Sequence, residues 1–132
     1  KPSSAASDVY KRQHANHEVF VTVMFETVAA FDDLDEIAAM PGIDALTVGP
    51  ADLAQDMGVF GKPEQGRALD GMRDRVLAAC KKHGKVCAML VNSFEQMEQW
   101  RNAGALLLAY SSDADILYSG YAAAMKRIKG GA

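Results

Sequence analysis

Several segments that would reveal a class of function are absent from these 132 residues. No apolar run approaches the ~20 residues of a membrane-spanning helix, and the N-terminal residues lack the apolar core of a secretory signal peptide. The formal net charge is only −3 and the basic residues form no stripe, which argues against nucleic acid as the main partner. We therefore expect a soluble, cytoplasmic protein with neither a membrane nor a nucleic-acid partner.

Cysteine is also scarce, since only Cys80 and Cys87 occur, seven positions apart. This spacing is neither a CxxC pair nor a disulfide framework. Cys80 falls in a helical pattern and Cys87 in a strand pattern, so we expect two free thiols buried in the core. The motifs GxxxxGK[ST] and GxGxxG do not occur either, and nucleotide binding is therefore unsupported.

The first residues differ in character from the remainder of the chain. Residues 1–16 are mostly small and polar and show no hydrophobic period, which predicts a disordered tail. Within it, "SSAASDVYKRQ" resembles translated sequencing-adapter sequence found at the ends of fragmentary gene models. We assign this tail no function and place the folded domain at residues 17–132.

Strand and helix patterns then alternate four times. The predicted strands are residues 19–26, 45–48, 86–91 and 106–110. Helices are predicted to begin near residues 33, 65, 93 and 111. Four βα units in succession predict an α/β fold with a parallel sheet and right-handed crossovers. A closed (β/α)8 barrel takes about 250 residues, so the pattern fits either a small open domain or half a barrel.

Local signals fix several of these helix ends. Asp32 or Asp33 can cap the first helix, and Ser93 with Gln96 forms a capping box for the third. Gly84 suits the C-terminal cap of the second helix.

Two carboxylates follow the first two strands. Side chains alternate along a strand, so Glu26 shares a face with Met24 at the end of an apolar run. Asp52 comes just past the second strand, after Gly49 and Pro50. Neighbouring strands lie about 4.8 Å apart, so the carboxylates can converge, and like charges that close need a cation or a proton between them. A hard divalent cation with water ligands would satisfy this need, and nearby backbone N–H groups could hold a small carboxylate.

Plainer roles remain open at these positions. Glu26 can be solvated, and Asp52 can cap a short helix. Ser111 and Ser112 fit helix capping better than nucleophilic catalysis, because no histidine ends a neighbouring strand. A Schiff-base aldolase would need a lysine inside the sheet at a strand's carboxyl end, and the sequence predicts none there.

The stretch "VMFETVAAFDDLDEIAAMPGIDALTVGPADLAQDMG", residues 23–58, resembles the HpcH/HpaI aldolase family. This family comprises metal-dependent class II pyruvate aldolases, such as 4-hydroxy-2-oxoheptanedioate aldolase and 2-dehydro-3-deoxyglucarate aldolase. The resemblance continues through "LLLAYSSDADILYSGY", residues 106–121, and covers residues 17–130 overall. It implies the C-terminal half of a (β/α)8 TIM barrel, in an oligomer whose last helix is exchanged between subunits.

The resemblance also implies a site and a reaction. Glu26 and Asp52 match the family's ligands for Mg²⁺, Mn²⁺ or Co²⁺, and the turn of Gly49, Pro50 and Ala51 matches the backbone that binds the carboxylate of pyruvate. The implied lyase cleaves or forms 4-hydroxy-2-oxo acids from pyruvate and an aldehyde through a metal-stabilised enolate. Such reactions belong to aromatic or sugar acid catabolism.

The chain departs from the family pattern in two respects. The family's catalytic His and substrate-binding Arg belong to the first half of the barrel, and residues 1–18 match neither motif, so His14 and His17 are assigned no role. Many members carry Gln two residues before the metal-binding Glu, where this chain has Met24. A second hypothesis is therefore a catalytically incompetent fragment that only binds metal or assembles through two open strand edges.

Overall fold

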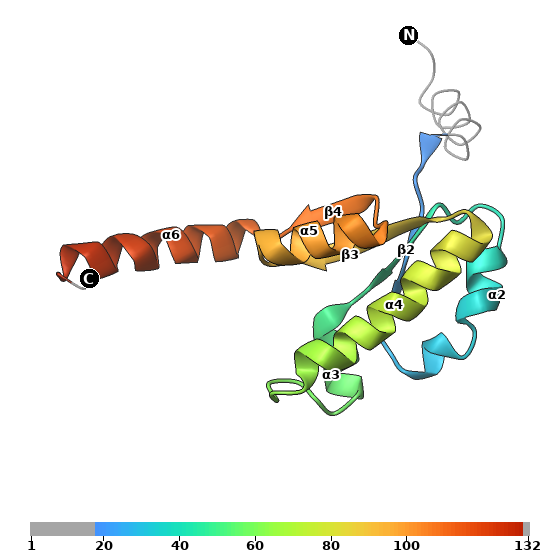
Figure 1. Cartoon of the computed structure of the whole chain (residues 1–132), viewed down its shortest axis with the longest axis horizontal. Helices are drawn as coiled ribbons and strands as arrows, with labels where there is room; N and C mark the ends of the chain where they lie inside the picture. Colours follow the sequence, from blue (N-terminus) through green and yellow to red (C-terminus); the bar gives the residue numbers. More distant parts are fainter. Residues whose placement is uncertain (1–17, 131–132) are drawn as a thin grey trace, which may run out of the picture.

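The computed structural model describes residues 18–130 and contains a parallel sheet of four strands (Figure 1). The strands lie in chain order and are β1 (Thr22–Phe25), β2 (Ala45–Val48), β3 (Val86–Val91) and β4 (Leu107–Tyr110). The predicted α/β architecture of four βα units is confirmed. The predicted tail of residues 1–16 lies outside the described part of the chain.

Helical segments connect and follow the strands. They are η1 (Ala29–Phe31), α2 (Leu34–Ala39), α3 (Pro50–Asp56), α4 (Gln65–His83), α5 (Phe94–Ala103) and α6 (Asp113–Ile128). The start of α4 and its end at Gly84, which adopts a positive φ of 66°, agree with the prediction. Ser93 caps α5 by accepting a hydrogen bond from the N–H of Gln96, and the Gln96 side chain accepts one from the N–H of Asn92.

Two predictions about the first βα unit were only partly correct. The first strand is shorter than residues 19–26, because only Thr22–Phe25 finds partners along the four residues of β2. Glu26 therefore follows the strand instead of belonging to it. Asp33 occupies the N-cap position of α2, as predicted, but its side chain makes no capping hydrogen bond. The short 3-10 helix η1 precedes α2 and is capped at its end by Asp32, whose backbone N–H donates a hydrogen bond to the carbonyl of Ala29.

The core lies on one face of the sheet, where α4 and α5 pack against the strands and α2 and α3 pack against α4. Strand residues that face these helices are buried: Phe25, Leu46, Val48, Cys87, Met89 and Val91. The cysteines are free and buried, as predicted. On the opposite face, Met24, Leu90 and Leu107 remain 36–46 % exposed. This open apolar face is where the inside of a closed barrel would be.

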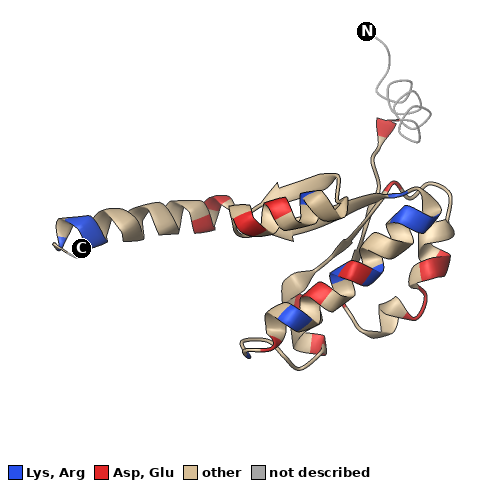
Figure 2. Cartoon of the chain, viewed as in Figure 1, with Lys and Arg blue, Asp and Glu red and all other residues tan. Residues whose placement is uncertain are grey.

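The last helix projects away from the other elements (Figure 1). None of the residues of α6 is buried, even though several of its side chains are apolar. Leu117, Tyr118 and Tyr121 are 62–76 % exposed. Charged residues gather at its two ends and leave its middle uncharged (Figure 2). Among the described residues, no helix has the length and apolar character required to cross a bilayer.

Candidate functional site

The side chain of Glu26 lies against the turn that follows β2. Phe25 is the register partner of Val48, and the N–H of Gly49 donates a 2.9 Å hydrogen bond to the carbonyl of Phe25. Glu26 and Gly49 are therefore neighbours at the carboxyl edge of the sheet. A Cβ atom on Gly49 would lie 2.6 Å from Cγ and 2.9 Å from Oε1 of Glu26, closer than such atoms approach.

Space, and not backbone conformation, requires glycine at this position. Gly49 has φ −83° and ψ 98°, which any residue can adopt. The missing side chain leaves a hollow that receives the carboxylate of Glu26. The resemblance assigns this turn to the carboxylate of pyruvate, and in the structure a carboxylate of the chain itself occupies part of the space beside Gly49.

Asp52 enters the same edge of the sheet from the first turn of α3. Pro50 begins this helix, where its fixed φ and missing N–H are tolerated. The first bond of the helix runs from the N–H of Leu53 to the carbonyl of Gly49, 3.1 Å away, so the N–H groups of Ala51 and Asp52 precede the helical ladder. The predicted backbone cradle is thus reduced by one donor, because the N–H of Gly49 is already bonded to β1.

Neither candidate carboxylate has a basic partner within residues 18–130. The ion pairs of this part of the chain join Arg73 to Asp70, and Lys82 and His83 to Asp35. Glu26 and Asp52 are exposed. Glu26 directly follows β1, and Asp52 lies in the first turn of α3, which follows the adjacent strand β2. The structure therefore brings the two predicted ligands to one edge and leaves their charges uncompensated by any described side chain.

The donor set suits a hard divalent cation. Across the described residues, no group of three or more His, Cys, Asp or Glu side chains gathers in a way that could hold a metal ion. A cation held by Glu26 and Asp52 would complete its coordination with water or substrate oxygens, as Mg²⁺ commonly does. By the chemistry of their oxygen donors, the two unpaired carboxylates fit such a cation.

Asp56 is a residue of this region that sequence reasoning missed. Its carboxylate accepts a 2.7 Å hydrogen bond from the N–H of Val28, 28 positions earlier in the chain. This bond fastens α3 to the segment that follows Glu26. Asp56 lies four residues after Asp52, on the same helix face, but only the fold shows which backbone group that face meets.

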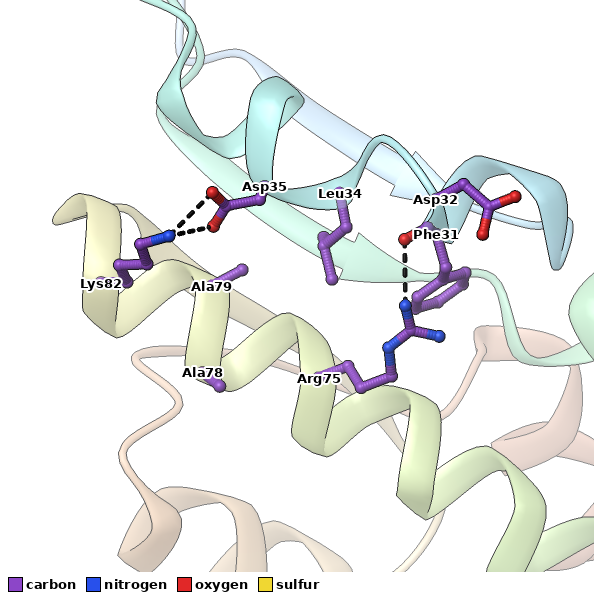
Figure 3. A pocket seen from close by; sticks show the side chains of 8 residues that line it. All are labelled: Phe31, Asp32, Leu34, Asp35, Arg75, Ala78, Ala79 and Lys82. Carbon is purple, nitrogen blue, oxygen red and sulfur yellow. Dashed lines mark hydrogen bonds and ion pairs between the residues drawn. The ribbon is translucent and has the colours of Figure 1, made fainter.

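A second polar region lies elsewhere, in a pocket of about 420 Å³ between α2 and α4 (Figure 3). Arg75 donates a 3.0 Å hydrogen bond to the carbonyl of Phe31, and Lys82 contacts Asp35 at 2.8 Å. These groups already satisfy one another, and the pocket lies among the helices that cover the sheet. We therefore assign it a role in packing and not in chemistry.

His83 is the one histidine among the described residues, and it lies far from the candidate site. It ends α4 and contacts Asp35 at 2.8 Å, three residues before β3 begins. The carboxyl edge of the sheet is at the other end of the strands. His14 and His17 are outside the described residues.

Comparisons with known proteins place the chain in one family. The model of the HpcH/HpaI aldolase/citrate lyase family matches residues 4–119. A hydroxypyruvate/pyruvate aldolase of Roseovarius nubinhibens is 35 % identical over 103 residues, which are 78 % of this chain and 40 % of the relative. A 4-hydroxy-2-oxo-heptane-1,7-dioate aldolase of Escherichia coli is 30 % identical over 105 residues, which are 80 % of this chain and 40 % of that protein.

Solved structures give the same result. The HpcH/HpaI aldolase of Desulfitobacterium hafniense superposes with a TM-score of 0.79 and 30 % identity, covering 98 % of this chain and 49 % of its own. An HpcH/HpaI aldolase/citrate lyase family protein from Burkholderia cenocepacia gives 0.77 and 34 %, covering 90 % of this chain and 46 % of its own. The chain thus spans less than half the length of these relatives, consistent with half of a barrel. By both fold and sequence, it belongs to the HpcH/HpaI aldolase/citrate lyase family.

Proposed function

We propose that the protein represented by this chain is a divalent-metal-dependent aldolase. This lyase would cleave or form 4-hydroxy-2-oxo acids, with pyruvate as one partner and an aldehyde as the other. The observation that carries the proposal is the pair of carboxylates, Glu26 and Asp52, at one sheet edge without a basic partner among the described residues. Family membership and the aldolase names of the relatives support it.

Each residue at this edge has a role in the proposal. Glu26 and Asp52 would hold Mg²⁺, Mn²⁺ or Co²⁺, which when bound supplies Lewis-acid polarisation of a keto oxygen. The turn of Gly49, Pro50 and Ala51 would receive the carboxylate of pyruvate, with the N–H groups of Ala51 and Asp52 as donors. Asp56 would keep α3 in place through Val28.

A second candidate function is a half-barrel that binds metal or assembles without catalysis. The observation in its favour is the position of His83, paired with Asp35 at the opposite end of the strands. The described residues therefore offer no histidine at the carboxyl edge to act as a base. In the aldolase proposal, the base and the substrate-binding arginine come from outside residues 18–130.

We further propose a homo-oligomer in which α6 contacts a neighbouring subunit. An apolar groove of about 350 Å³ runs along this helix between Ile116, Leu117, Gly120, Tyr121 and Ala124. Side chains this apolar and this exposed are typical of surfaces that another chain covers. Sedimentation velocity would test this, and a monomer at all concentrations would contradict it.

A calorimetric Mn²⁺ titration, with and without oxalate as a mimic of the pyruvate enolate, tests the metal site. We expect binding that strengthens with oxalate and is lost in the double variant Glu26→Gln/Asp52→Asn. The matched control, Asp32→Asn/Glu36→Gln, removes the same two charges from exposed positions outside the site and should bind normally. Equal binding by both double variants would contradict the proposed site. Pyruvate release by a longer protein that contains this chain would support the aldolase proposal, and its absence would favour the non-catalytic alternative.

A further inference from the structure

The two cysteines lie on elements that follow one another in the chain. Cys80 is in the last turn of α4, and Cys87 is the second residue of β3. Their exposed fractions are 1 % and 2 %, and both thiols are free. The pair lies near the amino ends of the strands, away from Glu26 and Asp52, and the proposed reaction uses neither thiol.

The turn between α4 and β3 brings the cysteines together. Gly84 ends the helix with a positive φ of 66°, and the N–H of Lys85 donates a 2.9 Å hydrogen bond to the carbonyl of Cys80. The thiol of Cys80 lies 3.5 Å from the carbonyl oxygen of Val86, the residue before Cys87. The backbone and the side chain of Cys80 therefore both contact the segment that leads directly into Cys87.

The two side chains belong to the same buried core, and their thiols form a hydrogen bond with each other. This hydrogen bond lowers the pKa of Cys80. The same bond, together with burial, raises the pKa of Cys87. Because the thiolate is the reactive form of cysteine, Cys80 is the nucleophile of the pair and Cys87 keeps its proton.

We propose that Cys80 and Cys87 form an oxidative modification site, which hydrogen peroxide converts to a disulfide between α4 and β3, with Cys80 oxidised first. A small oxidant suits this site because burial excludes bulky thiol reagents. A low-pKa thiol beside a second, resolving cysteine is the arrangement typical of redox-sensitive cysteine pairs. The inference is independent of the proposed metal site, since neither cysteine takes part in it.

The reaction consumes one peroxide molecule. The thiolate of Cys80 attacks one peroxide oxygen, the O–O bond breaks, and hydroxide leaves and takes up the proton released by Cys80, which leaves a sulfenic acid on Cys80. The sulfur of Cys87 then attacks Sγ of Cys80, the S–S bond forms, and the S–O bond breaks. The departing hydroxyl group leaves as water with the proton of Cys87. Two thiols are thus oxidised by two electrons, and peroxide is reduced to two water molecules.

The crosslink would close a ring over residues 80–87 and so hold the end of α4 on the start of β3. A disulfide restricts the unfolded chain, and the restriction is smaller for short rings. The peroxide-treated protein should therefore unfold at a slightly higher urea concentration than the reduced protein.

Peptide mapping of the peroxide-treated native chain tests the inference. Lys81, Lys82 and Lys85 lie between the two cysteines, so trypsin separates Cys80 from Cys87 unless a disulfide joins them. Peroxide is removed with catalase, remaining thiols are alkylated in urea, and the protein is digested without reductant. We expect residues 76–81 linked to residues 86–101, in protein that runs as a monomer on a non-reducing gel. Dithiothreitol should separate the two peptides.

Two variants test the order of oxidation. In Cys87→Ala the sulfenic acid on Cys80 has no resolving thiol, so dimedone should trap it, whereas Cys80→Ala should give little adduct on Cys87. An adduct mainly on Cys87 would overturn the assignment of Cys80 as the residue oxidised first. If both variants fail to fold, the linked peptides of the unaltered chain still decide whether the disulfide forms. Two alkylated cysteines after peroxide treatment, or a link found only in dimers, would overturn the inference.

Discussion

Glu26 folds over Gly49 so closely that a Cβ atom on Gly49 would lie 2.6 Å from Cγ of Glu26. The variant Gly49→Ala must therefore displace the carboxylate or shift the turn. Because Gly49 has an ordinary backbone conformation, alanine brings no φ strain, and the consequence should be confined to the position of Glu26. We expect Mn²⁺ affinity to fall by tenfold or more, roughly the effect of losing support around a metal ligand.

The control for this variant is Gly71→Ala. Gly71 lies within α4, and a Cβ atom there would meet nothing within 4 Å. Alanine in a helix interior is favoured over glycine by about 0.5–1 kcal/mol, so this variant should be more stable in urea and bind Mn²⁺ normally. Equal Mn²⁺ affinities of the two alanine variants would show that the hollow at Gly49 does not position Glu26.

Asp52 and Asp56 lie on the same helix, but replacing Asp56 should lower stability and replacing Asp52 should abolish Mn²⁺ binding. Asp56→Ala removes the 2.7 Å hydrogen bond to the N–H of Val28 and should cost about 1 kcal/mol more unfolding free energy than Asp52→Ala. Asp52→Ala should keep its stability and lose Mn²⁺ binding. Urea titrations and calorimetry of both variants would show whether stability and Mn²⁺ binding are lost separately. If they are not, the structural role of Asp56 and the ligand role of Asp52 are wrongly assigned.

Much of the fold could be predicted because its signals are local. The 19-residue α4 shows a regular apolar period and ends at Gly84, whose φ of 66° favours glycine. The strands β2 and β3 are apolar runs between turn residues and were predicted with the observed bounds. The resemblance of residues 23–58 to an aldolase family also held, because the family model matches residues 4–119.

What sequence could not supply depends on distant partners. The length of β1 is set by β2, 23 residues further along the chain in register, and not by the longer apolar run around it. The hydrogen bond of Asp56 joins segments 28 positions apart. Sequence also placed the N–H of Gly49 in the carboxylate cradle, whereas the sheet uses that group to bond Phe25.

Trp100 should dominate the stability of the α5 region. It is the single tryptophan of the chain, is 2 % exposed, and has the guanidinium of Arg73 5.9 Å from its ring centroid. Trp100→Ala should cost about 3–5 kcal/mol of unfolding free energy, as expected for a large buried side chain. Phe94 is 68 % exposed on the same helix and stacks on Tyr110, so Phe94→Ala should cost only about 0.5–1.5 kcal/mol.

Fluorescence and urea titrations check this prediction. Native Trp100 should emit at the short wavelengths of a buried indole and shift to the red on unfolding, which also provides the signal for the Phe94 variant. Circular dichroism follows the variant that lacks tryptophan. Similar losses for the two variants would contradict the burial of Trp100 as the source of stability.

The stability that Asp35 contributes to the packing of α2 against α4 should depend on pH. Hydrogen bonds from Lys82 and His83 hold the pKa of Asp35 below its usual 3.8. A carboxyl group with a lowered folded-state pKa contributes stability above its unfolded pKa and loses it as pH falls through the folded pKa. Asp35→Asn should therefore be less stable than wild type at about pH 6, with the difference disappearing toward about pH 2.

The effect should be small and sensitive to salt, because Asp35 is fully exposed and exposed ion pairs are screened. Urea titrations of both proteins across this pH range, repeated in about 1 M NaCl, measure it directly. Asp33→Asn is a suitable control, since Asp33 makes no capping hydrogen bond to α2 and lies two residues away. A stability difference for Asp35→Asn that persists at low pH would show that the contribution of Asp35 does not come from its charge.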